Sequence, residues 1–234
     1  MENEDNIKYP RGRYERKFFT REFSLKEIEN LIKTHPALFY EIYLPRRVNN
    51  IYLDSLGLEN YYDNVEGNTR RLKVRIRWYG EMFGLIKNPI LELKIKNEDV
   101  GGKMHFPLRE FLLDESFSNK KLHDNIFARS ELPHWLIEKL KLCKPALLNC
   151  YVRRYFLSID KKYRLTIDSN LIFFEIEDKA NIFLHRIKDQ ETIILELKYD
   201  KNDDYGISQI TQHFPFRLKR SSKYISGINL LGSF

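Results

Sequence analysis

Polar and apolar residues alternate in several stretches of the chain, and this pattern predicts β-strands with one polar and one apolar face. One such stretch is RRLKVRIRWYG at residues 70–80, in which every second residue from 72 to 78 is apolar. The opposite face of this predicted strand is entirely cationic. It carries Arg71, Lys73, Arg75 and Arg77.

The same alternation recurs in ILELKIK at 90–96 and in IILELKYD at 193–200. The first stretch places Glu92 and Lys94 on one face, and the second places Glu196 and Lys198 on one face. The strand predicted around Glu15 follows the same rule, because each of these glutamates precedes a lysine by two residues. Shorter predicted strands are RYERKFF at 13–19, NCYVRRYF at 149–156 and YRLTID at 163–168.

Two interpretations fit these strands. An antiparallel sheet with one solvated face shows the same alternation, but a solvated face normally mixes charges of both signs. Here the polar faces are strongly biased towards Arg and Lys in strands far apart in the sequence, and adjacent cations repel each other unless an anion compensates. We therefore predict an α+β fold built on an antiparallel β-barrel with a charged interior and helices packed outside. Such an interior would bind a polyanion, and its few carboxylates could hold a divalent metal.

The chain is predicted to form a flexible polar arm at 1–12 and a single domain at 13–234. A helix is predicted after Ser24 in SLKEIENLIKTHP, with Glu27 completing a capping box. Residues 97–150 are predicted to be a partly helical insertion outside the sheet, because PLREFLLDESF and LPHWLIEKLKL are typical of helices. Lys103 to Phe106 within it has no clear pattern. A further capped helix is predicted in YDKNDDYGISQITQHF.

Composition narrows the function. The 234 residues include 40 Lys and Arg against 33 Asp and Glu, a net charge of +7, which suggests a polyanionic partner. No apolar run approaches the roughly 20 residues that span a bilayer, and the start of the chain is too polar for a signal peptide. The 2 cysteines cannot form a disulfide framework. We expect a cytoplasmic protein.

Common catalytic motifs are missing. The sequence contains no GxxxxGK[ST] or GxGxxG loop, no HExxH or paired CxxC, and no GxSxG. Any phosphate binding must therefore come from side chains rather than from a glycine-rich loop. Arg offers bidentate donors that are always charged, and Lys offers point charges.

Taken in order, short segments across nearly the whole chain resemble one family. They are YERKF (14–18), RRVNNIYLDS (46–55), KVRIRWYG (73–80), LELKIK (91–96), YVRRYF (151–156), YRLTID (163–168), LELKYD (195–200) and RSSKY (220–224). The chain resembles the polyphosphate polymerase domain of the vacuolar transporter chaperone (VTC) family, in the triphosphate tunnel metalloenzyme superfamily. The resemblance implies an antiparallel barrel that forms a tunnel. It also implies transfer of the γ-phosphate of ATP onto a growing polyphosphate chain with Mn²⁺ or Mg²⁺.

The resemblance also implies roles for individual residues. Glu196 would be the metal ligand, with Glu15 as a second candidate. Catalytic cations that clamp phosphate oxygens would be Arg75, Arg77, Arg153, Arg164 and Lys223. Further phosphate-binding residues would be Lys17, Lys73, Lys94, Tyr151, Lys198, Arg220 and Ser222.

The sequence leaves three functions open. The hydrolytic branch of the superfamily begins with ExExK, whereas position 13 is Arg here and only Glu15-Arg16-Lys17 matches. This departure favours a polymerase over a tri- or polyphosphate hydrolase, the first alternative. The second alternative is a module that binds polyphosphate without catalysis. Nucleic acid is not expected as a partner, because a duplex needs an exposed basic surface. A membrane-protein partner and the oligomeric state stay open.

Overall fold

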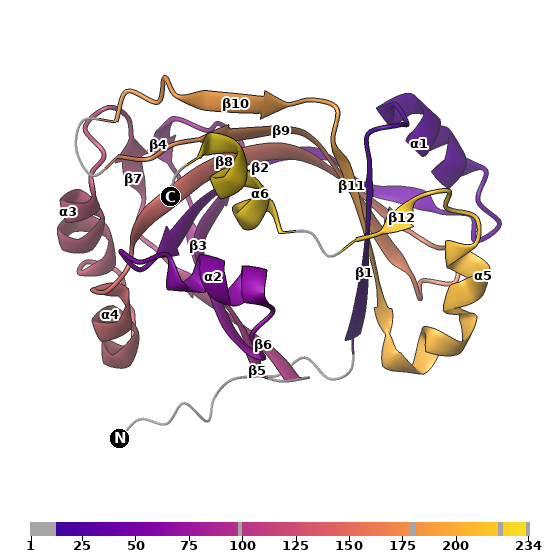
Figure 1. The fold of residues 1–234 in the computed structure, drawn as a ribbon, viewed down its shortest axis with the longest axis horizontal. Coiled ribbons are helices and arrows are strands. Elements are labelled where there is room, and N and C mark those ends of the chain that lie inside the picture. The colour runs from indigo at the N-terminus through magenta and orange to yellow at the C-terminus, as the bar shows by residue number, and fades with distance from the viewer. Residues whose placement is uncertain (1–12, 98–99, 178–180, 220–221, 233–234) are drawn as a thin grey trace.

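The computed structural model describes residues 13–97, 100–177, 181–219 and 222–232. One 10-stranded antiparallel sheet bends into an arch (Figure 1), with the strand order β12-β1-β11-β9-β8-β2-β3-β5-β6 and with β10 paired to β9. Its strands are β1 (Arg13–Thr20), β2 (Tyr40–Asp54), β3 (Arg70–Tyr79), β5 (Ile90–Asn97), β6 (Val100–Pro107), β8 (Lys144–Leu157), β9 (Arg164–Phe174), β10 (Arg186–Asp189), β11 (Ile193–Asp200) and β12 (Arg217–Leu218). The α+β class and the antiparallel sheet are therefore as predicted.

The predicted barrel is not closed. Among the described residues, no backbone ladder joins the two ends of the strand order. On one side β1 pairs with β11 and, over two residue pairs, with β12. On the other side β6 extends the sheet beyond β5, so β5 has no edge left for β1. Side chains meet across the opening instead, with Lys94 Nζ 3.7 Å from Glu15 Oε2.

Two hydrophobic cores hold helices against the outer face of the arch. One lies under α1 (Leu25–Lys33) and α5 (Ile207–Thr211), which follows the 3-10 helix η3 (Lys201–Gly206). The capping box of Ser24 and Glu27 starts α1 as predicted. The other core lies under α3 (Asn119–Lys121), the π-helix η2 (Leu122–Phe127), α4 (His134–Leu140) and a 2-stranded sheet of β4 (Gly84–Ile86) and β7 (Phe111–Leu113).

A third core lies on the inner face, where α2 (Glu59–Glu66) and α6 (Lys223–Leu231) pack beneath the arch (Figure 1). The fully buried carboxylate of Asp54 ties both helices to β2. It accepts hydrogen bonds from the backbone N–H groups that begin α2, and one oxygen lies 2.5 Å from the Tyr224 hydroxyl of α6. The helices α6 and α2 fill one end of this inner, concave face of the arch. The polar part of the concave face therefore lies beside them.

The segment at 97–150 differs from its prediction. The helix predicted in PLREFLLDESF is wrong, because Phe111–Leu113 is the strand β7 with two buried residues flanking an exposed one. Val100–Pro107 forms β6 and joins the main sheet, so this part does not lie outside it. The helix predicted in LPHWLIEKLKL is confirmed as α4. The segment is thus partly helical and partly strand.

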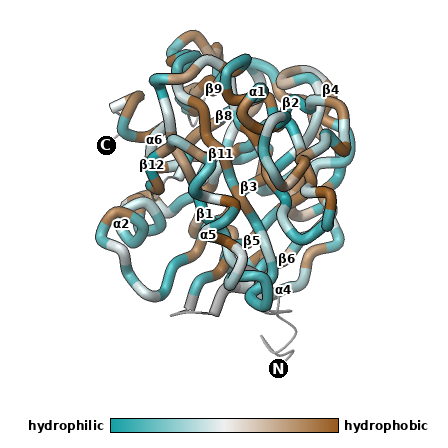
Figure 2. The backbone as a smooth tube through the Cα atoms, turned by 90° about the vertical axis from the view of Figure 1, so that its right-hand side faces the viewer, coloured by the Kyte–Doolittle hydropathy of each residue, from teal (hydrophilic) through white to brown (hydrophobic). Residues whose placement is uncertain are grey.

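Alternation of hydrophilic and hydrophobic residues along the strands is visible in Figure 2. A bulge in β9 changes which residues of this strand face the inside of the arch. The register with β8 shifts between Cys150 and Val152, and Asn170 adopts a φ of 53° there. Asn tolerates this left-handed conformation better than most residues. Because β9 gains one residue, Asp168 and Leu171 both face the inside of the arch.

Candidate functional site

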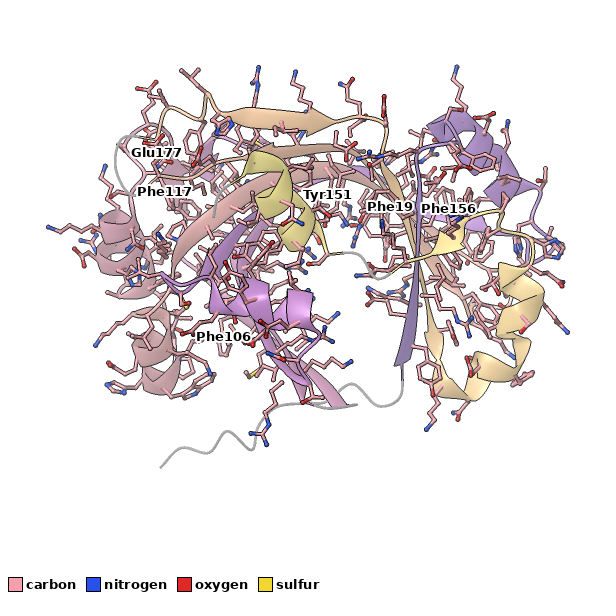
Figure 3. All side chains as sticks on the ribbon, in the orientation of Figure 1. Phe19, Phe106, Phe117, Tyr151, Phe156 and Glu177 are labelled. Carbon is pink, nitrogen blue, oxygen red and sulfur yellow. The ribbon has the colours of Figure 1, made fainter. Side chains whose placement is uncertain are left out.

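The concave face of the arch collects charged residues from strands that are distant in sequence. On one wall, β3 and β5 pair Arg75 with Glu92. On the opposite wall, β1 and β11 pair Lys17 with Glu196. Figure 3 shows side chains from both walls beneath the arch, with Tyr151 between α6 and β1 in this view. Carboxylates divide this face into three charged clusters.

The first cluster surrounds Glu92, which is 5% exposed. Arg75 Nε donates to Glu92 Oε2 at 2.7 Å, and Lys103 Nζ donates to Oε1 at 3.0 Å. Arg77 lies 3.6 Å from the same carboxylate. Although burial opposes ionisation, Arg75 and the other cations hold the pKa of Glu92 far below its usual value. Glu92 therefore fixes two arginines in position.

A hydrogen-bond chain extends this cluster towards the middle of the arch. Arg77 Nε donates to Asn50 Oδ1 at 2.8 Å, and its terminal nitrogen donates to the Tyr151 hydroxyl at 3.3 Å. Asn50 in turn donates to Asn149 Oδ1 at 2.9 Å. The Arg77 side chain is thus held on several sides and cannot swing freely.

The second cluster surrounds Asp168, which is fully buried. Arg153 donates two hydrogen bonds to its carboxylate, at 2.5 and 2.7 Å. Lys223 Nζ donates to Asp168 Oδ2 at 2.5 Å and lies 4.5 Å from the centre of the Tyr151 ring. Burial disfavours the charged carboxylate, but both cations lower its pKa on balance. The first residue of α6 is thereby joined to β8 and β9.

The third cluster holds two glutamates among lysines. Lys17 Nζ lies 2.8 Å from Glu15 Oε1 and 3.8 Å from Glu196 Oε2. Lys198 contacts both carboxylates, at 3.9 Å from Glu15. Burial opposes ionisation of Glu196, but Lys198 and Lys17 hold its pKa well below the usual value. For Glu15, burial and the nearby Glu196 raise the pKa, yet the lysines outweigh them.

The donor set of this third cluster fits a divalent metal that arrives with a phosphate ligand. Among the described residues, no three His, Cys, Asp or Glu side chains group closely enough to hold a metal alone. Mg²⁺, however, commonly binds one or two carboxylates and takes its other ligands from substrate phosphates and water. Glu15 and Glu196 supply two such carboxylates, and their present lysine partners are flexible.

Lys73 links the start of α6 to the wall formed by β3. Its Nζ donates to the Ser222 hydroxyl at 3.0 Å, immediately before α6 begins. Burial lowers the pKa of Lys73 to about 7, and the charges of Lys17, Lys94 and other cations add to the effect. Lys73 therefore changes its charge near neutral pH while facing the centre of the cationic face.

Most residues predicted from the sequence meet on the concave face, although their roles stay predictions. Arg164 is exposed at the start of β9, where it is the cross-strand partner of Lys198 on β11. Arg220 lies outside the described residues. The residues that the clusters bring together are Glu15, Lys17, Lys73, Arg75, Arg77, Lys94, Tyr151, Arg153, Glu196, Lys198, Ser222 and Lys223.

Several residues of the site had no predicted role. Glu92 and Asp168 were visible as polar strand positions, but a pattern within one strand does not show which cations they bind. Asn50 lies within the segment RRVNNIYLDS but is uncharged. On β6, Lys103 and His105 alternate with apolar residues. His105 lies 3.6 Å from Glu92. That alternation could have indicated a strand, but two glycines precede it.

A bent antiparallel sheet whose inner face carries arginines, lysines and a pair of glutamates has the shape and charge of a polyanion-binding site. A family model for the VTC domain matches residues 12–232. The chain therefore belongs to the VTC domain family. None of the helices in the described part of the chain is long and apolar enough to cross a membrane.

Solved structures with low sequence identity share the fold. The PH1819 protein from Pyrococcus horikoshii OT3 is 11% identical, with a TM-score of 0.50 over 94% of this chain and 98% of that one. HpAC1 from Hippeastrum, described as having a dominant triphosphatase activity, is 13% identical, with a TM-score of 0.50 over 92% and 96% of the two chains. No curated protein matches the sequence.

Proposed function

We propose that this protein is a metal-dependent polyphosphate polymerase that transfers the γ-phosphate of ATP onto the end of a polyphosphate chain. One observation carries the proposal. In a VTC domain, Arg75, Arg77 and Arg153 face the same concave space as the paired carboxylates of Glu15 and Glu196. This combination suits a triphosphate and its metal, because it offers fixed cations on one side and metal ligands on the other.

Phosphoryl transfer needs alignment of the reacting oxygens and neutralisation of their charge more than covalent help. Arg75, Arg77 and Arg153 are held by Glu92, Asn50 and Asp168, so their remaining N–H groups are positioned before the ligand arrives. The lysines are more exposed and can follow the ligand. This holds for Lys94 and Lys198, whereas Lys17 is about as exposed as Arg75.

Glu196 and Glu15 would hold a divalent metal, which would supply charge neutralisation on the phosphates of the donor. The acceptor in this proposal is the terminal phosphate of the chain. That group is already an anionic nucleophile, so the site needs to orient it rather than remove a proton from it. Lys73, with a pKa of about 7, can respond to the added negative charge by taking up a proton.

Hydrolysis of tri- or polyphosphate is the second candidate. In that reaction water replaces the acceptor phosphate. Among the described residues, β1 and β5 are joined by a side-chain contact and not by backbone hydrogen bonds. This opening favours access of water to the cationic face. The fold neighbour from Hippeastrum with its described triphosphatase activity adds to the case.

Incubation of the purified protein with ATP and Mn²⁺ tests the proposal. Polymerisation predicts long polyphosphate on a gel and one ADP for each phosphate added. Free phosphate without chains would support hydrolysis and contradict polymerisation. Glu196→Ala should abolish either reaction while the protein stays folded by circular dichroism. If that variant still formed polyphosphate and ADP, or still released phosphate, as fast as the unaltered protein, Glu196 would be excluded as the metal ligand.

A further inference from the structure

Three tyrosines surround an arginine at one end of the concave face. The guanidinium carbon of Arg46 lies 4.8 Å from the centre of the Tyr43 ring, 5.8 Å from that of Tyr155 and 5.9 Å from that of Tyr79. Tyr43 and Tyr155 also meet edge to face, with ring centres 5.6 Å apart. We call these four residues the tyrosine cluster.

The tyrosine cluster is open to solvent. Tyr43 is 51% exposed and Tyr79 is 49% exposed, so about half of each side chain could still be covered by a ligand. Arg46 is exposed as well, and no carboxylate in the described part of the chain lies within 4.0 Å of its guanidinium group. Its guanidinium group therefore lies against ring faces rather than in an ion pair with one of these carboxylates. Base planes stack readily on such aromatic rings and on guanidinium groups.

The cluster adjoins the arginines of the proposed phosphate site. Tyr155 follows Arg153 by two residues on β8, and Tyr79 follows Arg77 by two residues on β3. Residues two apart on a strand share a face and lie about 7 Å apart. Arg46 is also the cross-strand partner of Arg153. A molecule whose phosphates bind the arginines therefore has the cluster next to it.

The cluster lies away from the end that the helices fill. The core beneath α6 contains Tyr52 and Leu147, towards one end of β2 and β8. Tyr43 and Tyr155 lie towards the other ends of the same two strands, where they pair with each other. The two ends of the concave face thus differ, because one is packed with apolar side chains and the other presents exposed rings.

We propose that the tyrosine cluster binds the nucleobase of the triphosphate donor. This inference rests on the proposed function, since it assigns the base of a nucleoside triphosphate whose phosphates occupy the arginine site. Stacking favours large rings and reads few base edges, so the site should prefer purine over pyrimidine nucleotides and discriminate weakly between adenine and guanine. A polyphosphate chain has no base and should be indifferent to these rings.

Binding of two ligands to one set of variants tests the inference. Dissociation constants for ATP and for tripolyphosphate are measured by calorimetry with a chelator present, so that metal-dependent turnover does not consume ATP. Tyr43→Ala and Tyr79→Ala together should weaken ATP binding about tenfold or more and leave tripolyphosphate binding within about twofold. CTP should bind more weakly than ATP to the unaltered protein. Equal losses for ATP and tripolyphosphate, or no loss for ATP, would overturn the inference.

Controls separate stacking from general damage. Tyr43→Phe keeps the ring and should keep ATP affinity. Tyr205→Ala removes a tyrosine that is 79% exposed and faces Lys162 elsewhere, and it should alter neither ligand. Should the double variant not fold, the single variants carry the same test, because both side chains are half exposed.

The inference and the proposed function can fail separately. If the unaltered protein makes no polyphosphate from ATP and yet loses ATP affinity selectively in the variants, the base site stands and the polymerase proposal fails. If it makes polyphosphate but its ATP affinity ignores the tyrosines, the reaction stands and the base site fails. Absence of binding to both ligands would overturn both.

Discussion

Two strands of the sheet carry the same Leu-Glu-Leu-Lys sequence, but their glutamates have different neighbours. Glu92 on β5 accepts hydrogen bonds from Arg75 and Lys103 and lies close to Arg77. Glu196 on β11 contacts lysines and lies near a second carboxylate, that of Glu15. The same four residues thus form an arginine-binding site on one wall and a carboxylate pair on the other.

The difference follows from the chemistry of the partners. Arginine presents a planar set of donors that matches a carboxylate, so Glu92 is saturated and serves to position cations. Lysine is a flexible point charge without this planar set of donors, and Lys17 and Lys198 each contact both Glu196 and Glu15. This contrast supports the proposal that Glu92 positions the cations of the site, whereas Glu196 beside Glu15 would be the carboxylate that holds a metal.

Removal of the charge at Glu196 should have the largest effect. Glu196→Gln keeps the shape of the side chain but removes the carboxylate that we propose as the metal ligand, so turnover with saturating Mn²⁺ should fall by about 10²–10³-fold. Stability should fall less than in the Glu92 variant, because Lys17 and Lys198 retain Glu15 as an anionic partner. ADP release and urea denaturation measure the two effects. Glu81→Gln, a change at a carboxylate that is 88% exposed, is the control. More than a tenth of normal turnover would contradict the assignment.

Removal of the charge at Glu92, on the other wall, should instead affect stability more than turnover. Glu92→Gln leaves Arg75, Arg77 and Lys103 without their shared anion in a buried position, so the free energy of unfolding should fall by about 3 kcal/mol. Turnover per folded molecule should fall less than in Glu196→Gln. The same two assays apply. A stable Glu92→Gln protein that loses turnover as completely as Glu196→Gln would remove the distinction between the walls.

Much of this arrangement could be predicted from strand periodicity. Residues such as Arg75 and Glu196 fall on the polar face by alternation alone, and the cationic bias of that face indicated a polyanion. Alternation, however, says nothing about which strands face each other across the arch. The contact between Glu15 and Lys94 therefore comes only from the curvature of the sheet.

Other features could not be predicted for local reasons. The short strand β7 buries Phe111 and Leu113 around the exposed Leu112, and three residues are too few to distinguish a strand from a helix. The sequence also does not indicate a role for Tyr79, since it does not show that Arg46 lies beside the ring.

A smaller effect should appear with pH. Burial and neighbouring cations lower the pKa of Lys73 to about 7, whereas a lysine in the unfolded chain keeps its ordinary pKa of 10.5. The unfolded chain thus binds more protons between these values, and Lys73 makes the free protein more stable as pH rises from about 7 to 10.5. A bound polyanion raises this pKa, so tripolyphosphate affinity should fall as pH rises above about 7.

Calorimetry in buffers of different ionisation enthalpy checks this linkage. At pH 8 the protein should take up a proton from the buffer on binding tripolyphosphate, and Lys73→Met should reduce that uptake. Lys120→Met changes a lysine on α3, away from the arch, and should leave the uptake unchanged. Equal proton uptake by the Lys73→Met and unaltered proteins would show that another group accounts for the pH dependence.

The smallest effect should come from Lys94, which faces the opening between the walls. Its side chain is 57% exposed and 3.7 Å from Glu15, so Lys94→Met should cost about 0.5 kcal/mol of stability or less. Lys103→Met should cost more, because Lys103 is 37% exposed and donates to the buried Glu92. Both variants should bind tripolyphosphate more weakly with a shallower salt dependence, since each removes one cation from a polyanion site. Urea denaturation and salt-dependent titration compare them. A larger stability loss for Lys94→Met than for Lys103→Met would mean that the contact across the opening, rather than the arginine wall, holds the arch in shape.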